Sequence, residues 1–178
     1  MAQSNDTTPR GELTDPARDL FHAGLRLLHQ RRPGEAARKL EKARTLAPES
    51  VEVVLNLGGA YILQQRFDDA VVVLEHATKL DPQNAMAWIN LAAAYLGPLK
   101  KSRPDAQERA ITAYERALQA DPHAPNVHYM LGLIYRQRGE WLHAAAHFSR
   151  ALEINPADRD ARVMLDAVNR ADDEARQA

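Results

Sequence analysis

The sequence predicts an all-α fold: a solenoid (an α-α superhelix) of four helix–turn–helix units followed by one capping helix. The first observation is a period, because four prolines recur in steps of 34, 40 and 34 residues, at Pro48, Pro82, Pro122 and Pro156. The second is that two sets of alanines keep the same steps: Ala36, Ala70, Ala110, Ala144 and Ala43, Ala77, Ala117, Ala151. A fixed period of this length is the signature of a repeat architecture.

A third observation locates an insertion. Two further sets of landmarks step by 34, 34 and 40 residues: Gly24, Gly58, Ala92, Gly132 and Leu27, Tyr61, Tyr95, Tyr135. The long step therefore falls later in these sets than in the prolines and alanines. Six extra residues must lie inside the third unit, between Tyr95 and Ala110.

Each unit reads as two amphipathic helices. In the second unit, Val54, Leu57, Gly58 and Tyr61 follow the i, i+3, i+4, i+7 spacing of one helix face. A small residue in that stripe lets a second helix approach closely, and a proline ends the second helix because it cannot continue a helix interior. One such pair cannot bury its own apolar faces, so neighbouring units must stack.

At these landmarks the chain resembles the tetratricopeptide repeat family, whose unit is a helix–turn–helix of 34 residues. The resemblance covers residues 17–158. It implies a right-handed superhelix whose concave face binds peptides or partner proteins.

The expected organisation follows from the landmarks. Residues 1–14 are polar and are expected to form a disordered tail, with Thr14 or Asp15 before Pro16 as the helix-start signal. The four units are expected at residues 17–50, 51–84, 85–124 with the six-residue insertion, and 125–158 within the repeat region 15–158. Residues 159–178 read as a polar-backed capping helix whose end frays.

The third unit departs most from the pattern. Its first helix is apolar on nearly every side, and Met86, Ile89 and Leu96 are expected to face the groove or a partner. In the insertion, Ser102 is expected to cap the next helix, with Pro104 in its first turn.

The candidate binding surface is the face of each first helix that does not carry the stacking landmarks. It is apolar with a ladder of asparagines, whose side chains can bond a ligand's backbone. Its residues are Phe21, Leu25, Leu55, Asn56, Ile62, Met86, Ile89, Asn90, Asn126, Tyr129, Leu133 and Arg136. Such a lining suits an apolar or amphipathic peptide segment.

A narrower property of the family is not expected. Chaperone-binding members carry a clamp of lysine, arginine and asparagine that grips a C-terminal carboxylate. One asparagine matches the clamp in each alignment and no cation does. The corresponding residues are Phe21, Leu25, Asn56, Met86 and Asn90, or Leu55, Gly59, Asn90, Asn126 and Met130.

Other chemistry has little support. His143 and His147 share a helix face, but no further ligand is fixed, so they are interpreted as surface histidines rather than a metal site. The loop cations Lys100, Lys101 and Arg103 are diluted by acidic and polar neighbours. No nucleophile–base pair, phosphate loop or paired carboxylates occur, so no catalytic residue and no cofactor is expected.

Composition sets the remaining bounds. The net charge of −1 argues against a nucleic-acid or membrane-surface binder. With no cysteine there is neither a disulfide nor a thiolate metal site. The sequence has no apolar segment of membrane-spanning length, so a cytoplasmic location is expected.

The sequence therefore predicts a non-enzymatic scaffold or adaptor whose partner is another protein or peptide. Self-association through the same apolar surface, giving a homo-oligomer, stays open as the alternative. A metal-dependent enzyme is the weakest hypothesis.

Overall fold

The computed structural model describes residues 13–177, and in this range every regular element is a helix. The α-helices are α1 (Asp15–His29), α2 (Pro33–Leu46), α3 (Val51–Leu63), α4 (Phe67–Leu80), α5 (Ala85–Leu96), α6 (Pro104–Ala120), α7 (Val127–Gln137), α8 (Trp141–Ile154) and α9 (Arg159–Gln177). A short 3-10 helix, η1 (Leu99–Lys101), precedes α6. Most of the expected N-terminal tail, residues 1–12, lies outside the described residues.

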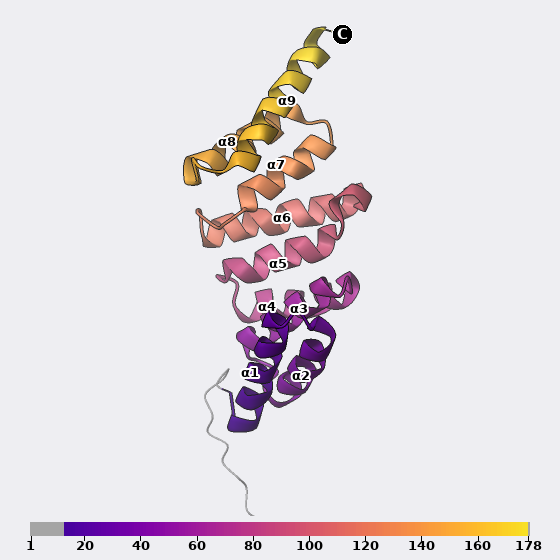
Figure 1. The fold of residues 1–178 in the computed structure, drawn as a ribbon, viewed down its shortest axis with the longest axis vertical. Helices are drawn as coiled ribbons and strands as arrows, with labels where there is room; N and C mark the ends of the chain where they lie inside the picture. Colours follow the sequence, from indigo (N-terminus) through magenta and orange to yellow (C-terminus); the bar gives the residue numbers. More distant parts are fainter. Residues whose placement is uncertain (1–12, 178) are drawn as a thin grey trace, which may run out of the picture.

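The helices stack in sequence order along one long axis (Figure 1). Each odd-numbered helix from α1 to α7 packs on the next helix to form a unit, and each second helix packs on the first helix of the following unit. The last such contact is between α8 and α9. The predicted all-α solenoid of four units and a further helix is confirmed.

Close approach within a unit depends on the small landmark. A Cβ placed on Gly58 of α3 would lie 2.4 Å from Cγ of Leu74 in α4, and one on Gly132 of α7 would lie 2.7 Å from the Phe148 ring of α8. Both partners are fully buried. Glycine at these places lets the second helix sit against the backbone of the first.

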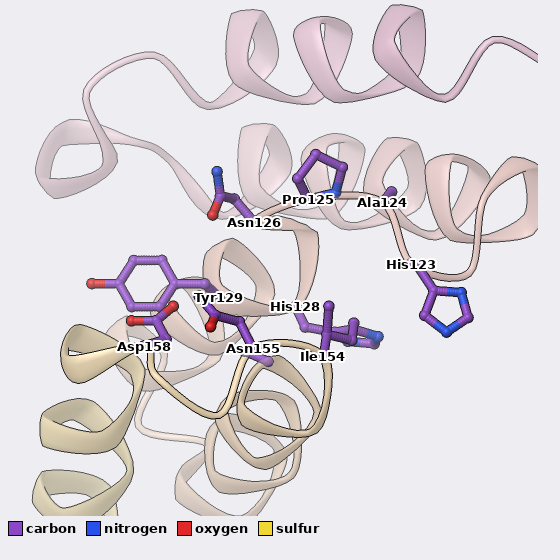
Figure 2. A pocket seen from close by; sticks show the side chains of 10 residues that line it. His123, Ala124, Pro125, Asn126, His128, Tyr129, Ile154, Asn155 and Asp158 are labelled. Atoms are coloured by element: carbon purple, nitrogen blue, oxygen red, sulfur yellow. The ribbon is translucent and has the colours of Figure 1, made fainter.

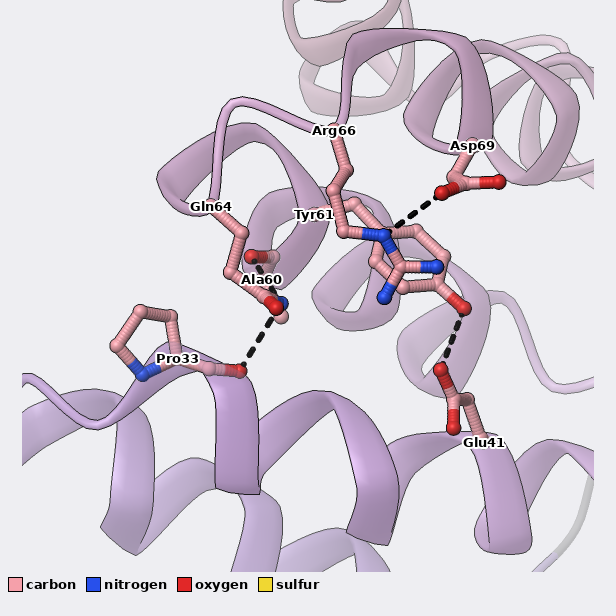
Figure 3. A network of polar contacts seen from close by, with 7 residues as sticks. All are labelled: Pro33, Glu41, Ala60, Tyr61, Gln64, Arg66 and Asp69. Carbon is pink, nitrogen blue, oxygen red and sulfur yellow. Dashed lines mark hydrogen bonds and ion pairs between the residues drawn. The ribbon is translucent and has the colours of Figure 1, made fainter.

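A tyrosine links each of the first two junctions between units. Figure 3 shows Tyr61 reaching from α3 to Glu41 of α2, with the Tyr61 hydroxyl donating to Glu41 Oε1 at 2.7 Å. The Arg66 guanidinium lies 4.3 Å from the centre of the tyrosine ring and pairs with Asp69. Burial, followed by the carboxylate of Glu41, raises the pKa of Tyr61 to about 12, so the hydroxyl stays a donor at neutral pH.

The fourth unit breaks the pattern at its start. Ser50, Asn84 and Asp158 each accept a hydrogen bond from the backbone N–H three residues on, which caps α3, α5 and α9. Ala124 occupies that place before α7 and has no side-chain acceptor. Helix α7 begins later, at Val127, after Asn126 in the left-handed region at φ 61°. The α6–α7 packing is the least extensive between consecutive helices.

Part of the six-residue insertion is helical. By the repeat spacing, the residue of α6 that matches the first residue of α4 (Phe67) is Gln107, yet α6 begins at Pro104. The predicted cap by Ser102 is wrong: its hydroxyl donates to the Leu99 carbonyl at 2.7 Å and accepts from the Gln107 amide at 3.0 Å. Ser102 therefore ties η1 to α6 instead of capping the helix.

Helix α9 occupies the place of a first helix in a fifth unit. Its Ala161 and Val168 are buried. By the repeat spacing, Asp166 matches Gly58 and Gly132, against which the second helices of their units pack. This face of α9 is therefore polar. Helix α9 continues to Gln177, with an ion pair between Asp172 and Arg176 one turn apart. Fraying of this end stays a prediction.

Candidate partner-binding surface

The twelve predicted groove residues lie on the first helices α1, α3, α5 and α7 or at the start of α7, and we call these faces the first-helix surface. Met86 is the most exposed of the apolar members, at 47%. Leu25, Leu55, Ile62 and Ile89 are partly buried and also pack against the core.

Two of the expected apolar contributors are not accessible. Phe21 is 6% exposed and belongs to the core cluster that α1 shares with α2, α3 and α4. Leu96 is 3% exposed and packs in the cluster with α6. Helix α5 is apolar on nearly every side, so the sequence pattern alone does not separate its core face from its free face. In the amphipathic α1, Phe21 belongs to the apolar stripe that faces the core.

The middle of the surface is open. A Cβ placed on Gly59 of α3 would meet no neighbouring heavy atom within 4 Å, in contrast to the adjacent Gly58. Leu63, at the end of the same helix, is 64% exposed. It was missed in the sequence because it lies beyond the landmark stripe at the last position of α3.

The asparagine ladder is only partly regular. Asn56 Nδ2 donates to the Glu52 carbonyl at 2.8 Å, so the side chain is anchored along its own helix. Asn90 is half-buried on α5. Asn126 is exposed and precedes α7 in a left-handed conformation, so it does not continue the helical row.

The C-terminal part of the surface is shared with α9. Tyr129 and Leu133 pack in a cluster with Met164 and Leu165 of α9, and the Arg136 guanidinium contacts the Met164 sulfur. Val163, which precedes Met164 in α9, is 58% exposed. The repeat pattern predicted a capping helix, but it did not indicate which groove residues that helix would contact.

A small cavity of about 160 Å³ lies where α7 starts late (Figure 2). Ala124, Pro125 and Asn126 form one side, and Ile154, Asn155 and Asp158 at the α8–α9 connection form another. Tyr129 and His128 complete the lining. The missing first turn of α7 accounts for this space.

The two histidines of α8 differ from one another. His143 is exposed and its Nδ1 lies 3.2 Å from Glu140 Oε2. His147 is partly buried, and the prediction of a surface residue is wrong for it. Its ring stacks on Tyr135 at 5.4 Å and 8°, and its Nδ1 lies 3.0 Å from Nδ1 of His128.

The contact between His128 and His147 requires one ring to donate its N–H and the other to accept. Burial, then the neighbouring His128 and His143, lowers the pKa of His147 to about 4. Burial also lowers the pKa of His128. Both rings are therefore neutral at pH 7. Among residues 13–177, no group of three or more histidine, aspartate or glutamate side chains is arranged to hold a metal ion.

The basic loop of the insertion borders a polar cavity of about 350 Å³ between α4, α5 and α6. Arg103 pairs with Asp105 at 2.8 Å, and Arg109 reaches Glu75 at 3.2 Å. The charge of Arg103 is thus neutralised within the loop and the start of α6. Separately, no helix in the described range is both long and apolar enough to cross a membrane.

Sequence profiles described as tetratricopeptide repeat match residues 27–95 and 108–159, which together make up more than half of the chain. No curated protein sequence matches significantly.

Solved structures share the fold at low sequence identity. MamA from Desulfovibrio magneticus aligns with a TM-score of 0.79 and 22% identity over 93% of this chain and 90% of its own. A second MamA structure gives 0.78 and 24% over 92% and 87%. A tetratricopeptide repeat protein from Parabacteroides merdae gives 0.76 and 20% over 90% and 62%. At these identities the likeness describes the fold alone.

Proposed function

The chain belongs to the tetratricopeptide repeat family, whose members are protein-interaction scaffolds, and on that premise we propose that it is a non-enzymatic adaptor. Its first-helix surface forms a concave groove, and this groove binds an apolar or amphipathic segment of another protein. The observation that carries this proposal is the free space at Gly59 of α3, together with the exposure of Leu63 of α3 and Met86 of α5.

The chemistry of this region supports a segment with an apolar face. Exposed large apolar side chains gathered on a soluble protein usually mark an interaction site. Leu55, Ile62 and Ile89 add partly buried apolar area to the same helices. Asn56 and Asn90 supply amide groups that can pair with backbone polar atoms of a bound segment.

The test compares two tryptophan substitutions. Gly59→Trp places a large ring in the open space of the first-helix surface, whereas Val72→Trp adds the same ring to an exposed position of α4, where Val72 is 67% exposed. Both proteins are used as bait in extract of the native cell, and captured proteins are identified by mass spectrometry. A partner retained by Val72→Trp and lost by Gly59→Trp supports the groove. Equal capture by both variants overturns it.

Self-association through the same surface is the second candidate, favoured by the exposure of Leu63 and Met86. A second copy covering these side chains would make the mass in solution depend on concentration. Light scattering over a hundredfold concentration range separates the two functions, because a strict monomer excludes self-association.

A further inference from the structure

The third unit contains a cavity of about 280 Å³ on the landmark face of α5, away from the residues of the first-helix surface. Trp88, Leu91 and Tyr95 of α5 line one side. The other side belongs to α6 and consists of Glu108, Arg109, Thr112 and Ala113. Leu91 and Ala113 are each 2% exposed, while Trp88 and Tyr95 are only partly buried. We call this cavity the Trp88–Tyr95 slot.

The fourth unit fills the equivalent place with a ring of its own. By the repeat spacing, His128 and Tyr135 match Trp88 and Tyr95, and His147 matches Ala113. The His147 ring stacks on Tyr135 and touches His128, so it spans the two side chains that correspond to the walls of the slot.

The second unit fills the same place with an aliphatic side chain. Val73 matches Ala113 and is 3% exposed, in one cluster with Val54 and Tyr61. Their counterparts in the third unit are Trp88 and Tyr95. The methyl group of Ala113 is too short to reach across, and the slot between Trp88 and Tyr95 stays open.

We propose that the Trp88–Tyr95 slot binds an aromatic side chain of a partner protein. The ring would take the place that His147 takes in the fourth unit, between the counterparts of His128 and Tyr135. Since a cavity of about 150 Å³ can hold benzene, the volume of the slot suffices for a phenyl, phenol or indole ring.

The walls favour a ring over an aliphatic group. Aromatic pairs attract one another beyond what the burial of their area provides. The Arg109 guanidinium lies 3.9 Å from the centre of the Tyr95 ring and is held there by Glu75, so it offers a flat cation at the edge of the slot. This site lies on other residues than the proposed groove, and either can exist without the other.

Trp88 provides the readout. The chain has two tryptophans, and the indole N–H of Trp88 donates to the Pro82 carbonyl at 2.9 Å, beside the slot. The full protein, labelled with ¹⁵N, is titrated with N-acetyl-phenylalaninamide and, separately, with N-acetyl-leucinamide. We expect saturable shifts at the Trp88 indole and at the amides of Leu91, Thr112 and Ala113, at least fivefold tighter for the phenyl probe.

The deciding variant is Ala113→His, which gives the third unit the side chain that fills the fourth. It should weaken binding of the phenyl probe at least tenfold. Gln119→His adds the same ring to an exposed position of α6 and should leave binding unchanged. If Ala113→His does not fold, Trp88→Val takes its place as the deciding variant, because the second unit has valine (Val54) at this position. Binding is then followed at the amides of Leu91 and Ala113.

The proposal is supported if Ala113→His or Trp88→Val loses binding of the phenyl probe while Gln119→His retains it. Equal affinity for the phenyl and leucine probes, shifts scattered over other helices, or undiminished binding in the deciding variant overturns it. The result does not depend on capture through the groove, so the two proposals fail separately.

Discussion

The hydroxyl of Tyr95 in the third unit donates a 2.7 Å hydrogen bond to Glu75 Oε1 in the second. The same bond joins Tyr61 to Glu41 one unit earlier. Arg109 reinforces the later bond, since it lies over the Tyr95 ring and reaches the same carboxylate oxygen at 3.2 Å. In the fourth unit Tyr135 stacks on His147 instead. The solenoid is therefore joined differently at its third junction.

Removing the Tyr95 hydroxyl should weaken the second junction. Tyr95→Phe keeps the ring and removes the hydroxyl that donates to Glu75, and a hydrogen bond to a charged group contributes about 1.5–3 kcal/mol. We expect a loss of about that size in the free energy of unfolding by urea. Tyr135→Phe, at the matching place without the bond to α6, should cost less, and an equal loss in both would contradict the role of the link.

Two adjacent glycines should respond in opposite directions. Gly58→Ala forces a Cβ to within 2.4 Å of Leu74, and such overpacking costs about 1–3 kcal/mol. Gly59→Ala meets only open space and should stabilise the protein by about 0.5–1 kcal/mol, because alanine is the better helix former. Chemical denaturation of both variants measures the difference. A similar effect of the two changes would contradict the packing described for α3 and α4.

The turns between paired helices should gain stability from glycine. Arg31, Gln65 and Gly139 occupy matching places in the first, second and fourth units, with φ of 58°, 59° and 74°. Only the fourth unit uses the residue that adopts this conformation without steric cost. Gln65→Gly should raise the melting temperature, because it relieves about 1–2 kcal/mol of left-handed backbone strain against a smaller gain in unfolded-state entropy. Gly139→Ala should lower it. Loss of stability in Gln65→Gly would contradict the assigned backbone.

Acid should destabilise the fourth unit. The pKa of His147 is about 4 in the folded protein and near 6.5 when the ring is free, so the unfolded chain binds more protons between these values. The stabilisation is complete above pH 6.5 and is lost as the pH falls toward 4. His128 acts in the same direction, because burial and then Arg150 lower its pKa while Glu153 opposes the shift.

Melting curves from pH 7.5 to 4.5 test this dependence. His147→Val copies the second unit, which has Val73 at this place, and should flatten the fall in melting temperature with acid. His143→Ala is the matched control, since its side chain is 69% exposed, and it should retain most of the fall. A slope unchanged by His147→Val would assign the acid sensitivity to other groups.

Much of the architecture could be predicted because its cause is local and repeated. The spacing of Gly58, Ala70 and Pro82 reflects the close approach of two helices and the end of the second, which every unit must satisfy. The late start of α7 also had a signal in the sequence, since Ala124 replaces the capping side chains of Ser50 and Asn84. That signal required comparison between units, not inspection of one.

The candidate sites were harder to predict because they depend on contacts between helices. Burial of Phe21 follows from how α1 packs against its neighbours. The position of His147 follows from the packing of α8 on α7, which brings it to His128, 19 residues earlier in the sequence. The contact of Arg136 with Met164 depends on where α9 docks. Side chains on helices that are apolar on several sides acquire their roles only from this packing.

Binding of a partner protein at the first-helix surface is tested most directly by photo-crosslinking in the native cell, with a benzophenone side chain at one of two positions. Met86 lies on the first-helix surface and Val72 on α4, and both are exposed. We expect a discrete crosslinked partner from position 86, with none from position 72. Crosslinks from position 72 alone, or the same products from both positions, would contradict it.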